Sequence, residues 1–223
     1  MILAVFRKEY YKIRRLWFMV LAMNLAVCVH LWMTTRRLFI LDHPEVVWYR
    51  VLHLGQIHYD SLVYVPVITG ILVACIQYLP EMWGERLKLS LHLPMSPHIL
   101  ILIHVWVGLV ALVLALLPDM ATLVWVTGQY FPIQAVATSV QTALPWFMAG
   151  IAAYLGATLV ILEPHYKRKG FNLALGAGCI AIYLKPAEPG SYAHITLFLL
   201  IPLICMAVSV LLPAFRFRFR RAM

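Results

Sequence analysis

The stretch PEMWGERLKLSLHLPMSP, from Pro80 to Pro97, is a polar interruption between two strongly apolar runs and carries charges of both signs. If the runs on either side cross a membrane, this stretch is a compact cytoplasmic element on a protein otherwise embedded in lipid. Its leucines between positions 87 and 93 alternate with polar residues, a pattern typical of a strand. Trp83, Leu87 and Leu91 also form a helical i, i+4 stripe. A helix is favoured because a lone strand at a membrane surface leaves its backbone groups unpaired.

The amino-acid composition indicates an integral membrane protein. Of the 223 residues, 63% are hydrophobic and only 12% are charged, whereas ordinary soluble domains carry about 25% charged residues. A membrane-spanning helix needs roughly 20 apolar residues, so there is room for about six spans and for no large soluble domain. We therefore predict one all-α transmembrane domain over residues 1–223.

The distribution of basic residues orients the predicted spans. Residues 98–131 form either one crossing or two, and Pro118 marks an outer end or a kink in that run. With a single crossing and both termini inside, 14 of the 18 Lys and Arg residues fall on the cytoplasmic side. Splitting the run would put the basic cluster at 167–169 outside, so the positive-inside rule favours one crossing. The six predicted spans are residues 16–33, 61–79, 98–120, 134–162, 171–184 and 195–212.

The N-terminal segment carries apolar residues at helical spacing from Leu3 to Trp17, with basic residues between them. This pattern predicts an amphipathic helix in the membrane interface, and a simple basic anchor for the first span is an equal alternative. The first span lacks a small-residue cleavage site, so we expect it to be retained. With the C-terminal FRFRFRRAM, the segment predicts a membrane-surface anchor on anionic lipid rather than a nucleic-acid site. The anchor residues are Arg7, Lys8, Lys12, Arg14, Arg15, Arg216, Arg218 and Arg220.

Local signals refine the outer loop and the fourth span. Asp42 as the N-cap, with Pro44 in the first turn and Glu45 three residues later, predicts a helix from about His43, and we expect this helix to bend near Gly55. Pro66 predicts a kink in the second span. Small residues recur at four-residue spacing in the fourth span, which allows close helix contact in lipid. They are Ala149, Ala153 and Ala157, with Ala152 and Gly156.

Motifs for intrinsic chemistry are missing from the sequence. There is no GxxxxGK[ST] phosphate-binding loop, no HExxH, no CxxC and no GxSxG. The four cysteines lie far apart inside apolar runs, which is typical of buried apolar residues rather than metal ligands or disulfides. We therefore predict that the chain is not an enzyme and binds no metal or cofactor of its own.

Polar residues inside predicted spans are functional hypotheses, because they are expensive to place in lipid. Asn24, Gln77, His104 and Gln141 are on this basis predicted to line the bundle interior and a substrate path.

The nine histidines raise a second hypothesis, a haem or metal cofactor in a redox or assembly complex. The spacings of His53 to His58 and of His98 to His104 do not place two ligands on one helix face. Such a cofactor would instead use His30, His53, His58 or His104.

The order of these features resembles the membrane subunit of type-2 ABC exporters. The matching segments are FRKEYYKIRRLWF at 6–18, ahead of the first span, and GERLKLSLHLPMSPHIL at 84–100. Two features depart from the family pattern. Arg86 and Leu87 replace the usual Gly-Thr after the acidic residue, and the loop at 185–194 is too short for re-entrant helices.

The resemblance implies a permease subunit in a bacterial cytoplasmic membrane, driven by a separate ATPase subunit that binds ATP and Mg²⁺. It implies a homo- or heterodimer with a second permease subunit. It also implies a cytoplasmic coupling helix that docks into a groove of the ATPase. The coupling residues would be Glu85, Leu87, Leu91, Leu93, Pro94 and Ser96. A membrane scaffold with no transport path is a further alternative.

Overall fold

The computed structural model describes residues 2–83, 96–185, 189–190, 192, 194–213 and 216. In these ranges every regular element is a helix, which confirms the predicted all-α class. The elements are α1 (Ile2–Leu41), α2 (Pro44–Leu52), the 3-10 helix η1 (Asp60–Leu62), α3 (Val65–Met82), α5 (Pro97–Tyr130), α6 (Ile133–Leu162), α7 (Tyr166–Leu184) and α8 (Leu200–Ser209).

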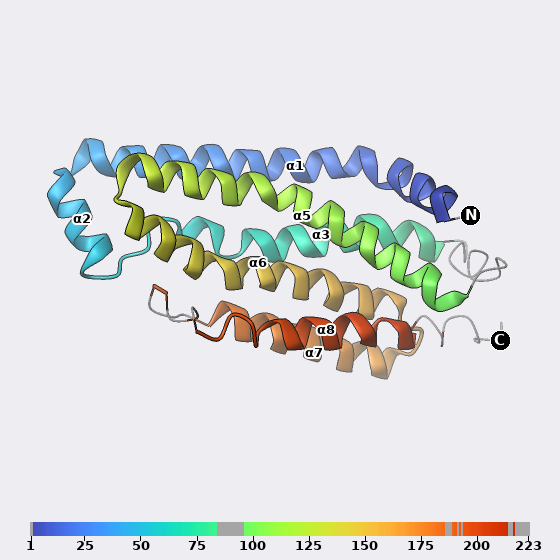
Figure 1. Ribbon diagram of the computed structural model, residues 1–223. Coiled ribbons are helices and arrows are strands. Elements are labelled where there is room, and N and C mark those ends of the chain that lie inside the picture. The colour runs from blue at the N-terminus through green and yellow to red at the C-terminus, as the bar shows by residue number, and fades with distance from the viewer. Residues whose placement is uncertain are drawn as a thin grey trace.

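The long helices run side by side in one elongated bundle. Figure 1 shows α1 along one side, α7 and α8 along the opposite side, and α3, α5 and α6 between them. Helix α2 crosses one end of the bundle. At the other end, on the right in Figure 1, lie the first turns of α1, α5 and α7 and the last turns of α3, α6 and α8. We call this the basic end, because the first turns of α1 carry five Lys and Arg residues, from Arg7 to Arg15, and α7 begins with a Lys-Arg-Lys cluster.

Four helices in the described ranges are long and apolar enough to cross a membrane. They cover Val5–Leu41, Asp60–Met82, His98–Tyr130 and Ile133–Leu162. The fifth predicted span lies within α7, which begins with a Lys-Arg-Lys cluster, and α8 forms only 10 residues of the sixth predicted span. The structure therefore supports a membrane protein, while six spans and the sidedness of the termini stay predictions.

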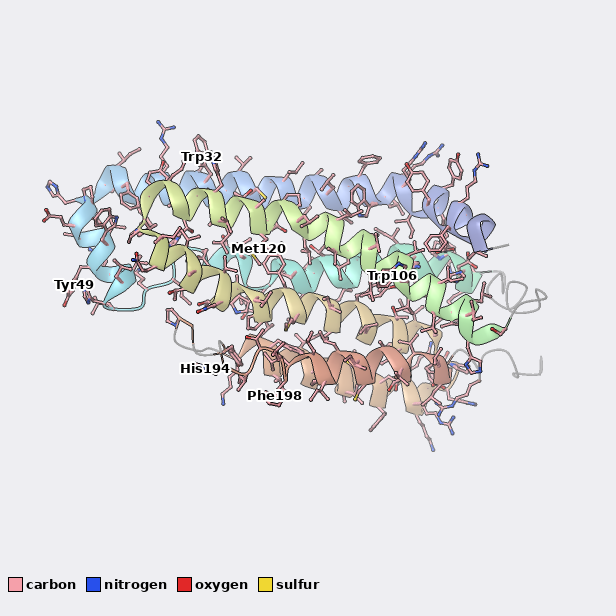
Figure 2. All side chains as sticks on the ribbon, in the orientation of Figure 1. Trp32, Tyr49, Trp106, Met120, His194 and Phe198 are labelled. Atoms are coloured by element: carbon pink, nitrogen blue, oxygen red, sulfur yellow. The ribbon has the colours of Figure 1, made fainter. Side chains whose placement is uncertain are left out.

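The outer surface of the bundle is apolar. Trp106 on α5 is 61% exposed, and Phe198 just before α8 is 68% exposed. Figure 2 shows that most nitrogen-bearing side chains gather toward the two ends, while apolar side chains surround the middle. An apolar surface this large would promote aggregation in water, whereas in a bilayer it faces lipid.

Helix α1 differs from the predicted interfacial helix followed by a separate span. It continues without a break through both segments for 40 residues. At 1.5 Å per residue its length is about 60 Å, roughly twice the hydrocarbon thickness of a bilayer. The N-terminal part is therefore an extension of the first bundle helix, and its inner face includes Val5, Glu9 and Ile13, all less than 9% exposed.

The third apolar run forms one helix, in agreement with the single crossing chosen from the basic residues. Pro118 lies inside α5, which continues to Tyr130, so Pro118 does not end the span. The fourth predicted span, 134–162, differs from α6 by one residue.

Two local predictions around the outer loop are wrong in detail. The N-cap of α2 is His43 rather than Asp42, and the Asp42 carboxylate instead accepts a hydrogen bond of 2.7 Å from Arg50 Nη1. Pro66 lies in the first turn of α3, where proline leaves no hydrogen bond broken and causes no kink. The helix also does not bend at Gly55, because α2 ends at Leu52 and the chain turns after it at Gly55, where φ is 65°.

Small residues bring α6 close to its neighbours, as the sequence spacing predicts. Ala149, Ala152 and Ala153 are each at most 1% exposed. A β-carbon added at Gly156 would come within 3.1 Å of the Cα of Gly176 on α7. The contacts place α6 at the centre of the bundle, against α3, α5, α7 and α8.

Candidate functional site

A buried ion-pair network joins four helices near the basic end of the bundle. Helix α1 contributes three side chains, α3 two, and α5 and α6 one each. We call this set the buried network: Lys8, Glu9, Lys12, Gln77, Glu81, His104 and Tyr154.

Glu81 connects α3 to α1. Its Oε1 atom lies 3.0 Å from Lys8 Nζ and 3.2 Å from Lys12 Nζ. Glu81 is 2% exposed, whereas the Lys8 side chain is 48% exposed. Because Lys8 and Lys12 are one helical turn apart on α1, a single carboxylate is clamped by two successive turns of the neighbouring helix.

Glu9 lies deeper than Glu81 and is fully buried. Its Oε1 atom is 2.6 Å from Lys12 Nζ and 3.4 Å from His104 Nε2, and its Oε2 atom accepts a hydrogen bond of 3.2 Å from Gln77 Nε2. The His104 Nδ1 atom faces the Leu100 carbonyl at 2.8 Å. A proton on Nε2 would therefore turn the contact with Glu9 into an ion pair.

Gln77 carries the network on to α6. Its amide nitrogen also donates to the His104 carbonyl at 2.7 Å, and its amide oxygen accepts a hydrogen bond of 2.8 Å from Tyr154. Gly108 leaves the room that these two side chains need, because a β-carbon there would collide with both the Tyr154 hydroxyl and the Gln77 amide oxygen. A glycine is thus required at this position by packing rather than by backbone conformation.

The network balances charge in a low-dielectric site. Two carboxylates face two ammonium groups, and paired charges avoid much of the cost of isolated buried ions. Removing one partner leaves an uncompensated charge, which is strongly destabilising. The arrangement is suited to holding α1, α3 and α5 in one relative position.

The four residues predicted to line the bundle interior occupy different environments in the structure. Gln77 and His104 belong to the network, and Asn24 is buried apart from it, where it accepts a 3.1 Å hydrogen bond from Thr69. Gln141 is exposed, contrary to its predicted interior position. It shares an exposed face of α6 with Gln134 and Ala137, because α6 turns its other faces toward its neighbours.

Some of the residues predicted to anchor the chain at the membrane surface are exposed, whereas others form ion pairs within the bundle. Arg7, Arg14 and Arg15 are exposed as expected, but Lys12 is only 15% exposed and turns inward to the two glutamates. Arg216 pairs with the buried Glu163 at 2.9 Å, so it too is partly a structural residue. Arg218 and Arg220 lie outside the described residues.

Most of the predicted coupling helix also lies outside the described residues. This applies to Glu85, Leu87, Leu91, Leu93 and Pro94. Ser96 is described: it is exposed and is the N-cap of α5.

The histidines considered for a cofactor do not come together. His30 and His53 are exposed, His104 is in the network, and His58 is buried near the opposite end. Across the residues that the structure describes, no three His, Cys, Asp or Glu side chains form a group able to hold a metal ion.

The buried His58 side chain makes the stability of the folded chain depend on pH. It stacks on Phe131 with ring centroids 4.7 Å apart, and burial lowers its pKa from 6.5 to about 4. The unfolded chain binds a proton below pH 6.5, while the folded chain does so only near pH 4. Stability should therefore fall as pH drops from 6.5 to 4, by roughly 3 kcal/mol in total.

Thermal unfolding in detergent at pH 7, 6, 5 and 4 measures this dependence. His58→Phe should flatten the decline over this range, because no buried imidazole then resists protonation. His53→Phe, which removes an exposed histidine, is the matched control and should keep it. An unchanged slope in His58→Phe would assign the decline to other groups.

A second buried polar pair was also missed by sequence reasoning. Cys28 Sγ on α1 lies 3.2 Å from Asp119 Oδ1 on α5, and both residues are buried. Asp119 follows Pro118 and was therefore placed at the outer end of a span. Glu9 and Glu81 were missed for a related reason, since both lie in polar flanks of apolar runs. One available signal is that Glu9 lies on the same helical face as Val5 and Ile13.

Similarity to other proteins does not identify the site. Comparisons of the chain with protein-family models, with curated proteins and with solved structures found no match.

Proposed function

We propose that this chain is the membrane permease subunit of an ATP-binding-cassette transporter, driven by a separate ATPase subunit that carries ATP and Mg²⁺. The observation that supports this most is the position of the buried network. Glu81 precedes segment 84–95, which connects α3 to α5 along the chain, by three residues, and its carboxylate is bonded to α1. A force applied to that segment would reach α1, α3 and α5 through one set of contacts.

The two ion pairs of Glu81 suggest how α3 would move relative to α1. Glu81 contacts both Lys8 and Lys12, which lie one turn apart on α1, so sliding α3 along α1 by about 5.4 Å, the pitch of one turn, would keep one of these ion pairs and break the other. Packed helices exchange between discrete arrangements of this kind rather than deforming continuously. Nucleotide-driven motion of the ATPase would bias this exchange.

The packing of the bundle favours a path between two subunits. Side chains fill the described interior, where Val73, Leu112, Ala115 and Ala149 are fully buried. A substrate path through this one bundle would require its core to open. We therefore place the path at the interface with a second permease subunit, identical or homologous, in a bacterial cytoplasmic membrane. Asn24, Gln77 and His104 are buried inside this bundle, so among the predicted path residues only the exposed Gln141 is placed where it could face such an interface, and its role there is a prediction.

Co-purification tests the proposal directly. The chain, tagged and expressed together with the ATP-binding-cassette ATPases of the same genome, should retain one of them through affinity and size-exclusion steps in mild detergent. The purified complex should hydrolyse ATP faster than the ATPase alone. If the chain associates with none of these ATPases in any of several mild detergents, the proposal is ruled out.

A double substitution tests the coupling segment. Leu87→Glu with Leu91→Glu should weaken association with the ATPase by roughly 30-fold or more, because charged residues would replace apolar anchors at an interface hot spot. Leu52→Glu with Leu54→Glu, at exposed positions on the opposite end, is the matched control and should bind normally. A membrane scaffold without a transport path predicts no difference between the two variants.

A further inference from the structure

A groove between α7 and α8 opens at the basic end of the bundle, with a cavity volume of about 350 Å³. Its lining includes basic and apolar side chains together with two uncharged polar residues, Asn172 and Ser209. Basic side chains line one part and apolar side chains line the other. The basic residues are Lys167, Arg168 and Arg216, and the apolar residues include Phe171, Leu175 and Leu212.

The basic part of the groove has spare positive charge. Arg216 bonds to Glu163 at 2.9 Å, which neutralises one cation. Within the part of the chain that the structure describes, neither Lys167 nor Arg168 forms an ion pair with a carboxylate. Two exposed cations at the mouth of one groove favour an anionic group there.

The apolar part runs from these cations toward the middle of the bundle. Arg168 and Leu175 are seven residues apart on α7, which corresponds to about 10 Å along the helix axis. Phe171 between them is 67% exposed, and Leu212, three residues after the end of α8, is 57% exposed. A small soluble anion would use only the basic mouth, whereas a molecule with an anionic head and an apolar tail would fill both parts.

We infer that this groove binds one anionic phospholipid, with its phosphate at Lys167 and Arg168 and an acyl chain along Phe171, Leu175 and Leu212. Basic pockets between membrane helices recognise anionic headgroups on the cytoplasmic side. The bias of Lys and Arg toward the basic end places the groove in that leaflet under the positive-inside rule. This inference does not depend on the proposed transport function.

Native mass spectrometry of the purified protein in detergent measures lipid binding directly. Dioleoyl phosphatidylglycerol should bind with one tight site, and dioleoyl phosphatidylcholine should not. Lys167→Gln with Arg168→Gln should weaken the tight site roughly 30-fold, at about fivefold for each lost charge. Arg36→Gln with Arg37→Gln removes the same charge from exposed positions on α1 and should leave the affinity unchanged.

A steric variant and a competing soluble anion distinguish binding of a whole phospholipid from binding of a phosphate group alone. Leu175→Trp fills the apolar part without changing charge, and it should abolish the tight site. Inorganic phosphate at millimolar concentration should not compete with the lipid. The inference is overturned if both charge variants lose affinity equally, if Leu175→Trp binds normally, or if inorganic phosphate displaces the lipid, which would identify a simple anion site.

Discussion

Replacing Lys12 with methionine is expected to destabilise the folded bundle by roughly 3–5 kcal/mol, the range measured when one partner of a buried ion pair is removed. Methionine keeps most of the length of the lysine side chain but leaves Glu9 and Glu81 without the ammonium group that lies 2.6 Å and 3.2 Å from them. Lys8 still pairs with Glu81. Glu9 keeps only the Gln77 amide and the His104 ring, so it becomes the uncompensated charge.

The loss should appear as a lower midpoint of thermal unfolding in detergent micelles. For a chain of this size, each 1 kcal/mol corresponds to about 2–4 °C, so a decrease on the order of 10 °C is expected. Arg15→Met removes the same charge from an exposed position three residues later and should change the midpoint little. Adding Glu9→Gln to Lys12→Met should recover part of the loss, because it removes the unpaired carboxylate. Equal midpoints for Lys12→Met and Arg15→Met would show that the network is not a stabilising unit.

The sequence predicted helix cores more accurately than helix ends. The fourth span was located to within one residue, because Pro132 before it and Glu163 with Pro164 after it bound the apolar run sharply. Helices α1 and α5 continue for eight and ten residues beyond the C-terminal ends of the first and third predicted spans. An apolar run predicts the part of a helix that lies in lipid. Backbone hydrogen bonds can continue the helix beyond that part, through polar residues such as Arg36.

The site was predicted only in part, because it depends on how the helices are rotated about their axes. Gln77 and His104 were found, since each interrupts an apolar run. Lys12 was assigned to the surface with its basic neighbours, and the sequence alone could not show that α1 turns this one lysine toward α3. Gln141 carried the same polar signal as Gln77 but lies on an exposed face of its helix.

Gly70→Ala should be the most damaging single-methyl change at the contact of α3 with α6. A β-carbon at Gly70 would come within 3.1 Å of the Tyr154 backbone nitrogen and closer still to the Gly150 carbonyl oxygen. These are backbone atoms and cannot rotate away, so the two helices would have to separate. We expect a loss of roughly 3 kcal/mol, at the upper end of the usual cost of overpacking, despite the better helix propensity of alanine.

Gly178→Ala is the matched control, because Gly178 lies in α7 with nothing within 4 Å of an added β-carbon. The control should be neutral or more stable by up to about 1 kcal/mol, since alanine favours a helix over glycine. Thermal midpoints of the two variants measured in one detergent test the contact, and equal midpoints would show that α3 and α6 do not meet at Gly70.

Combining Gly70→Ala with Lys12→Met tests whether the helix contact and the buried network act together. Tyr154, whose hydroxyl bonds to Gln77, lies one turn beyond Gly150 on α6. Separating α3 from α6 at Gly70 should therefore also break that hydrogen bond and loosen Gln77 from Glu9. Because the first substitution would already have weakened what the second removes, the combined loss should be smaller than the sum of the two single losses. Strictly additive losses would mean that the network stabilises α1 against α3 independently of how α3 meets α6.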